Sequence, residues 1–179
     1  MQKPLQLLPI KHKEYQIRLA QPADLSAVFE MGFESWGEGR SLSEYKDFCS
    51  QAPKYQKGLR YVLEISDQLV SSCMCYEYVL APYLKVLGIG SVATNKNFRQ
   101  KGYASHLLEQ LLNEYIRNSF YDTFVLFSDI EPKFYEKLGF VIAPDELQNC
   151  ANSILMIKSS KQLDNQKIKI FLENKIEYF

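Results

Sequence analysis

The fold of this chain is decided by the stretch Val92-Ala93-Thr94-Asn95-Lys96-Asn97-Phe98-Arg99-Gln100-Lys101-Gly102-Tyr103-Ala104-Ser105. It leaves an apolar, strand-like segment, passes through a polar cationic loop, and enters an amphipathic helix. The first turn of a helix carries backbone N–H groups that lack helical partners, and the helix dipole adds partial positive charge there. Gly102 removes the Cβ that would hold a ligand off the backbone, and Arg99 and Lys101 add full charges. The stretch therefore predicts a binding site for a pyrophosphate-bearing cofactor.

Two other kinds of phosphate-binding loop are excluded by the sequence. The pattern G-x-x-x-x-G-K-[ST] does not occur, and Gly88 and Gly90 form only an isolated G-x-G. The pattern that does occur is R-x-x-G-x-A, formed by Arg99, Gly102 and Ala104. Taken alone, these three positions also fit an ordinary basic loop in front of a helix, so the flanking segments have to decide.

The flanking segments have the periodicities of a strand–loop–helix–strand unit. Apolar residues recur at helical spacing from Ala104 to Ile116, with polar residues on the other face. The run 86–92 reads as a buried strand before the loop, and 123–127 reads as another strand after the helix. A crossover of this length predicts that the two strands are parallel neighbours.

A second motif follows about thirty residues after Gly102, in the run Phe134-Tyr135-Glu136-Lys137-Leu138-Gly139-Phe140. Pro132 suits the first turn of a short helix, and Gly139 suits its C-terminal stop. With both motifs in place, the chain resembles the GNAT superfamily of acyl-CoA-dependent N-acyltransferases over roughly residues 15–158. That family's signatures are [Q/R]-x-x-G-x-[G/A] after an apolar strand, followed by a tyrosine in an F/L-Y-E-x-x-G-F-like run.

The resemblance implies a mixed α/β (α+β) GNAT-like fold, with a central mixed sheet of six to seven strands flanked by about four helices. The residue patterns predict a strand over 15–19, a helix beginning near 22, a helix over 41–51 that starts with a capping box, and a hairpin of strands 60–65 and 69–79. Two short strands, 140–142 and 153–157, complete the expected sheet. We expect one domain over 1–179, with a loose polar lead-in (1–14) and a C-terminal extension (160–179) in which 167–176 fits either a strand or a helix.

Composition narrows the class of protein. Lys plus Arg equals Asp plus Glu at 21 each, so no general basic field favours nucleic acid as a partner. The four cysteines lack metal-ligand spacing, so we expect reduced, packed thiols and no metal site. The start of the chain lacks the apolar core of a signal peptide, and no apolar run approaches membrane-spanning length. These features predict a cytoplasmic protein without a membrane partner.

The resemblance also implies which residues hold the cofactor, acetyl-CoA, with CoA as the product. The backbone of Val92, Ala93 and Thr94 is expected to pair with the pantetheine arm like an added strand, with the N–H near Thr94 meeting the thioester oxygen. The backbone of Gln100, Lys101, Gly102, Tyr103, Ala104 and Ser105 is expected to hold the pyrophosphate. The Arg99 side chain is expected to point either toward phosphate or into solvent. Ser128 stands where relatives often have a polar residue that touches the cofactor, although a turn or a helix cap explains it equally well.

Tyr135 is the residue that the resemblance assigns to acid catalysis. The departing thiolate has to be protonated, and a tyrosine hydroxyl is a donor at neutral pH. Its position in a short amphipathic helix beside Phe134 and Phe140 also fits a core aromatic residue. The family match favours the catalytic interpretation.

The general base is left open by the sequence. Many family members place a glutamate on the central strand just before its cofactor-binding end, but this stretch is Gly88-Ile89-Gly90-Ser91. Glu77, Glu34 and Glu38 are candidates to act through water, and each reads more simply as a solvated surface acid. His106 lies on the polar side of the predicted helix, where a solvated side chain is expected.

The acceptor pocket is expected between the first two helices and the hairpin. Aromatic residues there hint at an amine with apolar flanks: Phe33, Trp36, Tyr45, Tyr76, Tyr78 and Tyr83. The leading hypothesis is an acetyl-CoA-dependent N-acetyltransferase that acts on a primary amine of a small molecule, amino acid or peptide. The alternatives are an acyl-CoA-binding sensor with little turnover and a structural protein without a cofactor. A homodimer is a family-level expectation.

Overall fold

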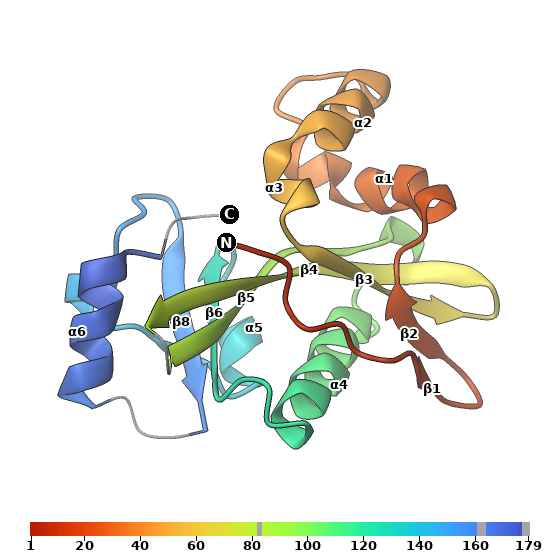
Figure 1. Ribbon diagram of the computed structural model, residues 1–179. Coiled ribbons are helices and arrows are strands. Elements are labelled where there is room, and N and C mark those ends of the chain that lie inside the picture. Colours follow the sequence, from red (N-terminus) through yellow and green to blue (C-terminus); the bar gives the residue numbers. More distant parts are fainter. Residues whose placement is uncertain (82–83, 161–163, 177–179) are drawn as a thin grey trace.

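The structure is a computed structural model that describes residues 1–81, 84–160 and 164–176. Within these residues the chain forms one eight-stranded sheet in the order β1-β2-β3-β4-β5-β6-β8-β7 (Figure 1). The strands are β1 (Ile10–Lys11), β2 (Gln16–Leu19), β3 (Leu59–Ile65), β4 (Gln68–Ala81), β5 (Leu84–Thr94), β6 (Thr123–Ser128), β7 (Val141–Ile142) and β8 (Ile154–Ser159). All neighbours are antiparallel except β5 and β6, which are parallel as predicted.

Six α-helices accompany the sheet in the described ranges: α1 (Leu25–Trp36), α2 (Leu42–Gln51), α3 (Pro53–Gln56), α4 (Tyr103–Arg117), α5 (Lys133–Glu136) and α6 (Asn165–Asn174). The predicted mixed α/β class is confirmed. The sheet has one strand more than the upper end of the expected range, because β1 lies in the segment expected to be loose. The helix count exceeds four because of α3, a single turn that sequence periodicity does not reveal, and α6, which lies in the extension that fitted either a strand or a helix.

Local sequence signals explain where several elements begin. Ser41 caps α2, accepting a hydrogen bond from the Glu44 N–H while the Glu44 carboxylate accepts from the Ser41 N–H. Ser66 and Asp67 have φ values of +47° and +59°, which suit the two-residue turn that joins β3 to β4. The predicted capping box and hairpin are therefore both present.

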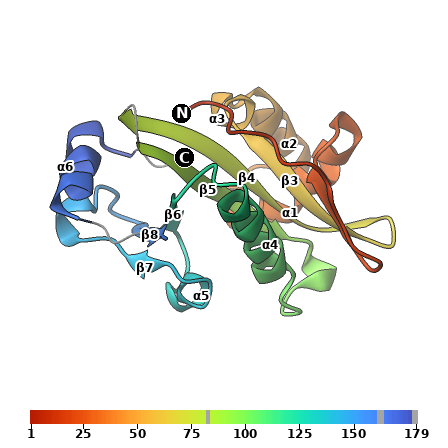
Figure 2. The same cartoon turned by 60° about the horizontal axis from the view of Figure 1, so that its bottom comes forward.

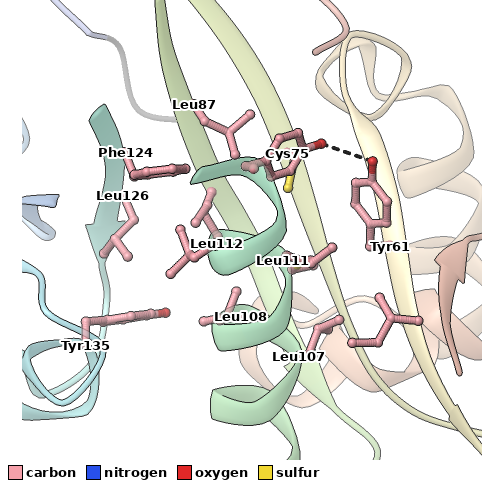
Figure 3. Packing of buried hydrophobic residues seen from close by; sticks show 14 of the residues in the cluster. Tyr61, Cys75, Leu87, Leu107, Leu108, Leu111, Leu112, Phe124, Leu126 and Tyr135 are labelled. Carbon is pink, nitrogen blue, oxygen red and sulfur yellow. Dashed lines mark hydrogen bonds between the residues drawn. The ribbon is translucent and has the colours of Figure 1, made fainter. Parts of the chain in front are cut away.

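Helices cover both faces of the sheet (Figures 1 and 2). Helices α1, α2 and α3 lie on one face, and α4 lies on the other. The predicted apolar stripe of α4 supplies Leu107, Leu108, Leu111 and Leu112, all at most 2% exposed, to the main core (Figure 3). This packing fixes the direction of α4, and therefore the position of its N-terminus at the end of β5.

The N-terminal segment lies along the sheet, so the expectation of a loose lead-in was wrong. Residue Gln2 forms an antiparallel bridge with Glu77 of β4, and β1 pairs with β2. Leu7 is 4% exposed, and its N–H donates to the Tyr61 hydroxyl at 3.0 Å. Composition does not reveal the contacts of Gln2 and Leu7, because they join residues more than fifty positions apart.

We expect Leu7→Ala to lower the free energy of unfolding by about 2–3 kcal/mol, because it leaves a cavity in the main core. The adjacent Leu8 is 85% exposed and provides a matched control, for which Leu8→Ala should change stability by less than about 0.5 kcal/mol. Urea unfolding of both variants measures the difference. Equal midpoints for the two variants would show that the segment does not contribute to the core.

The C-terminal extension forms a helix in its described part, so of the two interpretations the helical one holds. Asp164 caps α6 by accepting from the Lys167 N–H at 2.8 Å. Ile170 and Phe171 are buried against the β4 and β8 end of the sheet. The remaining residues of the extension, 161–163 and 177–179, lie outside the described residues.

The four cysteines are unbridged, and Cys49, Cys73 and Cys75 are buried, as expected for packed thiols. Across the described ranges, no helix combines the length and the apolar character needed to cross a bilayer.

Candidate active site

The sheet opens between its two parallel strands. β5 and β6 pair only from Val86 to Ile89 on β5, and beyond Ile89 the strand continues beside β4 alone. A register shift in the β4–β5 pairing accompanies a φ value of +47° at Ser91. Bulges of this kind bend a strand and redirect its end. Within the described chain, the edge of β5 from Gly90 to Thr94 that faces β6 therefore has no strand partner.

A cleft of about 670 Å³ occupies this opening. It is bounded by the end of β5, the end of β6, the turn α5 and the C-terminal end of α1. Its lining residues are Ser35, Trp36, Ile89, Gly90, Ser91, Val92, Phe127, Asp129, Ile130, Tyr135, Cys150, Asn152 and Ser153. The predicted strand end and the predicted catalytic tyrosine thus face one space.

The strand end is held by side chains on its other side. The Ser71 hydroxyl donates to the Ala93 carbonyl at 2.9 Å and lies 3.2 Å from the Thr94 hydroxyl. The Arg99 Nε donates to the Thr94 carbonyl at 3.2 Å. These contacts fix the backbone of Ala93 and Thr94, which directly follow Val92, the last residue of β5 that lines the cleft.

The loop before α4 has the conformation that a helix N-terminal anion site needs. Gln100 and Gly102 both have left-handed backbones, with φ values of +61° and +78°. Gly102 is the N-cap residue of α4, and the His106 N–H donates to its carbonyl at 2.9 Å. The N–H groups of Tyr103, Ala104 and Ser105 therefore lie in the open first turn. Apart from Gly102 itself and its two chain neighbours, no atom of the described chain lies within 4 Å of a Cβ placed on Gly102, so the space around that position is open.

The Arg99 side chain is exposed and also contacts two other parts of the chain. Its guanidinium forms an ion pair with Glu34 on α1 while Nε holds the Thr94 carbonyl. Arg99 thus ties the loop to α1. Lys101 is exposed, with its ammonium 5.4 Å from the centre of the Phe98 ring.

Tyr135 belongs to the core and to the cleft at once. It is 7% exposed, and its ring packs against Phe134 and Phe140 with centroid distances of 4.8 and 6.2 Å. Its hydroxyl end is directed toward α4 in Figure 3, and the residue also lines the cleft. Burial, together with the negative charge of Asp129, raises the pKa of Tyr135 above its usual value. The hydroxyl is therefore a proton donor across the physiological range, and the two interpretations of this residue are compatible.

A family comparison decides the class of this site. The family described as "Acetyltransferase (GNAT) domain" matches residues 16–143, well over half of the chain. The chain belongs to the GNAT acetyltransferase family. No curated protein matches the sequence.

Solved GNAT structures share the fold at low identity. A GNAT family N-acetyltransferase of Escherichia coli, determined in complex with CoA, is 19% identical and has a TM-score of 0.60, over 84% of this chain and 83% of that one. The ribosomal-protein-S18-alanine N-acetyltransferase of Escherichia coli is 16% identical with a TM-score of 0.59, over 84% and 97%. Ard1 of Thermoplasma volcanium is 19% identical with a TM-score of 0.58, over 83% and 99%.

The GNAT cofactor, acetyl-CoA, fits the groups that this chain presents. The unpaired edge of β5 offers backbone groups to an extended arm, in the way that a sheet accepts an added strand. The open first turn of α4 offers N–H groups to a pyrophosphate, and no described side chain other than those of the two chain neighbours could lie within 4 Å of the Gly102 Cβ position. As a member of the family the chain uses acetyl-CoA, and the residue-by-residue contacts stay predictions.

Ser128 and its neighbour Asp129 have different roles beside the cleft, because only Asp129 lines it. Ser128 is buried, and its hydroxyl donates to the Ile130 carbonyl at 2.8 Å, which is the turn-forming interpretation. Asp129 is exposed, lines the cleft and accepts a hydrogen bond from the Ser153 hydroxyl. Sequence reasoning missed Asp129 as a functional candidate. The sequence feature that could have identified Asp129 is an acid directly after a strand of the parallel pair, the position at which α/β sheets bind ligands.

None of the acids considered as a base lines the cleft. Glu77 is 5% exposed and accepts from the Tyr121 hydroxyl at 2.6 Å, so the expectation of a solvated acid was wrong there. Glu34 pairs with Arg99, and Glu38 pairs with Arg40 at 2.9 Å.

His106 was also expected to be solvated, and it is not. Its ring is half-buried edge-on to Tyr15, with the ring centroids 4.5 Å apart. Tyr15 belongs to the N-terminal part of the chain, so a periodicity count on α4 alone does not reveal this contact.

Most of the aromatic residues expected in an acceptor pocket pack elsewhere. Trp36 lines the cleft, whereas Phe33 and Tyr45 pack together between α1 and α2 at 5.6 Å. Tyr76 and Tyr78 are buried on the sheet face. Tyr83 lies outside the described residues.

Proposed function

We propose that this GNAT chain is an N-acetyltransferase that moves an acetyl group to a primary amine by direct attack in a ternary complex. The observation that carries this proposal is one cleft lined by the free edge of β5 and by Tyr135, in a chain that runs from the end of β5 through a short loop into the open first turn of α4. Acetyl-CoA, when bound, supplies an activated acetyl group and a thiolate leaving group.

The chain contributes three functions to this reaction. The backbone of Val92, Ala93 and Thr94 orients the acetyl-bearing arm, and an N–H near Thr94 stabilises charge on the carbonyl oxygen. The backbone of Gln100–Ser105 holds the pyrophosphate. The Tyr135 hydroxyl donates a proton to the departing thiolate, a role supported by its burial and its place on the cleft wall. Ser128 supports the turn that carries Asp129 into the cleft.

An amine must lose its proton before it attacks, since its lone pair is otherwise occupied. Asp129 is the carboxylate among the residues that line the cleft. We assign it the role of attracting the cationic amine and accepting its proton through water. The proposed acceptor is a small molecule, an amino acid or a peptide. We further propose that the protein is cytoplasmic and that residues 1–179 act as one domain. Two copies of the chain form a homodimer in this proposal.

A second candidate, an acyl-CoA sensor with little turnover, is favoured by one observation. Glycines occupy positions 88 and 90 of the central strand, and no acid stands between them and the strand end. The sensor would bind acetyl-CoA without chemistry.

A thiol-release assay across a panel of primary amines separates the two candidates. The enzyme should release CoA in proportion to added amine and form the acetylated amine in equal amount. Acetyl-CoA binding measured by calorimetry without amine-dependent thiol release would identify the sensor. Absence of binding as well would contradict both.

A further inference from the structure

A second pocket, of about 310 Å³, lies on the face covered by α1, α2 and α3. Its lining is mostly apolar and contains no acid: Leu19, Ala20, Leu25, Phe29, Cys49, Ser50, Tyr55, Gln56, Gly58, Leu59 and Arg60. It shares no lining residue with the active-site cleft. We call it the Arg60 pocket.

Arg60 is the one charged residue that lines this pocket. It lies on β3, where its neighbour Tyr61 faces the core under α4, so strand alternation turns Arg60 toward α1 and α3. Its guanidinium carbon is 4.7 Å from the centre of the Tyr55 ring and 5.3 Å from that of Phe29. The arginine is thus placed among aromatic rings.

This guanidinium lacks an anionic partner in the described chain. Its Nη2 atom is buried and makes no hydrogen bond, and none of the ion pairs within the described ranges includes Arg60. Arg18 on the neighbouring strand β2 shows the usual arrangement, pairing with Asp24 and Glu64 at 2.6 Å each. Accordingly, the pKa of Arg18 is raised by its partners, whereas burial lowers the pKa of Arg60.

A buried charge without a partner is costly, and ring faces compensate for it only in part. A guanidinium presents a planar fork of donors that matches a carboxylate in bidentate geometry. The polar atoms of Ser50 and Gln56 are too few to satisfy the several oxygens of a phosphate group. The walls formed by Leu19, Leu25 and Leu59 suit a short hydrocarbon chain.

We propose that the Arg60 pocket binds the carboxylate of a small apolar carboxylic acid, with Arg60 as its anchor. Two sources of this carboxylate are consistent with the geometry. One is a free acid that binds apart from the reaction. The other is the acceptor amine's own carboxylate, a version that rests on the proposed function. In sheet register Arg60 is opposite Met74, and Met74 is opposite Gly90 of the cleft, so two strand spacings of roughly 10 Å separate the sites.

Calorimetry on the full chain without acetyl-CoA tests the pocket itself. Hexanoate should bind the wild type and raise its Tm, whereas hexanamide, which lacks the charge, should not. Arg60→Met should weaken hexanoate binding by about 10–100-fold, which is the range for losing a charge-assisted bidentate contact. Arg60→Lys should fall between the two, because it keeps the charge and loses the fork.

Two features of the variants guard against a purely structural effect. Ligand-free Arg60→Met should be at least as stable as the wild type, because it removes an unpaired charge. Arg117→Met, on the exposed surface of α4, should bind hexanoate like the wild type. Equal hexanoate affinity in Arg60→Met and the wild type, no binding by the wild type at millimolar concentration, or a clearly less stable ligand-free Arg60→Met would each overturn the proposal.

Acetyl transfer to 6-aminohexanoate and to hexylamine identifies the source of the carboxylate. If the acceptor supplies it, the KM for 6-aminohexanoate should be the lower of the two in the wild type and should rise in Arg60→Met, while the KM for hexylamine stays the same. If a free acid supplies it, both amines should behave alike. The calorimetric result holds even if no amine is acetylated, so failure of the proposed function and failure of this proposal are distinguishable.

Discussion

Tyr135→Phe is expected to lower kcat by about 10²–10⁴-fold and to leave the Kd for acetyl-CoA nearly unchanged, because the ring stays and only the proton donor is removed. The ring's contacts with Phe134 and Phe140 do not involve the hydroxyl, so stability should change little. Steady-state kinetics and calorimetric titration with acetyl-CoA measure the two effects separately.

Tyr15→Phe is a matched control for this variant, since Tyr15 packs on His12 and His106 and does not line the cleft. It should retain wild-type kcat. Turnover of Tyr135→Phe within about threefold of the wild type would remove Tyr135 from the chemistry and leave it a core residue.

The pH dependence of kcat gives an independent check on Tyr135. Because burial raises the pKa of Tyr135, its proton stays bound as the pH rises through about 10, the ordinary tyrosine value. Ionisation of Tyr135 should therefore not lower kcat at or below about pH 10. A wild-type alkaline limb near pH 9 that vanishes in Tyr135→Phe would contradict this.

Gly102→Asp is expected to raise the Kd for acetyl-CoA by about 10²–10³-fold. Two like charges about 4 Å apart repel by roughly 1–4 kcal/mol between bulk water and a protein surface, and a pyrophosphate carries more than one charge. Asp tolerates the left-handed backbone of this position, and the added side chain has room, so the fold should persist.

Two further variants separate charge from shape at this position. Gly102→Asn has nearly the same size without the charge and should lose affinity by about tenfold or less. Gly39→Asp is a matched control, because Gly39 has the same φ of +78° and open space around its Cβ position. Gly39 lies in the loop after α1. It should bind acetyl-CoA like the wild type. Equal affinities for Gly102→Asp and the wild type would mean that the α4 N-terminus does not hold the pyrophosphate.

The sequence predicted those features that depend on local patterning. The stripe Leu107–Leu112 predicted α4 and its buried face, the capping residues Ser41 and Glu44 predicted the start of α2, and the parallel pairing of β5 with β6 followed from a single crossover. Each of these depends on residues within about forty positions of one another, where periodicity and capping have a direct physical meaning.

Features that depend on contacts between distant residues could not be predicted from the sequence. The partner of Arg99 is Glu34, sixty-five positions away, and Glu77 accepts hydrogen bonds from Tyr121 and Gln2, which are also distant in sequence. From the sequence alone, a charged or apolar residue at such a position is interpreted as a surface or linker residue, because the element that packs against it is not known. Asp129 was missed for a related reason, since its importance comes from the separation of β5 and β6, a property of the sheet that neither strand shows alone.

The core under α4 includes both Tyr135 and the leucines that aim the helix at the loop around Gly102. Selection for a well-packed interior and selection for catalytic alignment therefore act on the same side chains. Substitutions in that interior are therefore expected to alter catalysis together with stability, whereas the residues of α6 line neither the cleft nor the Arg60 pocket and are constrained by stability alone.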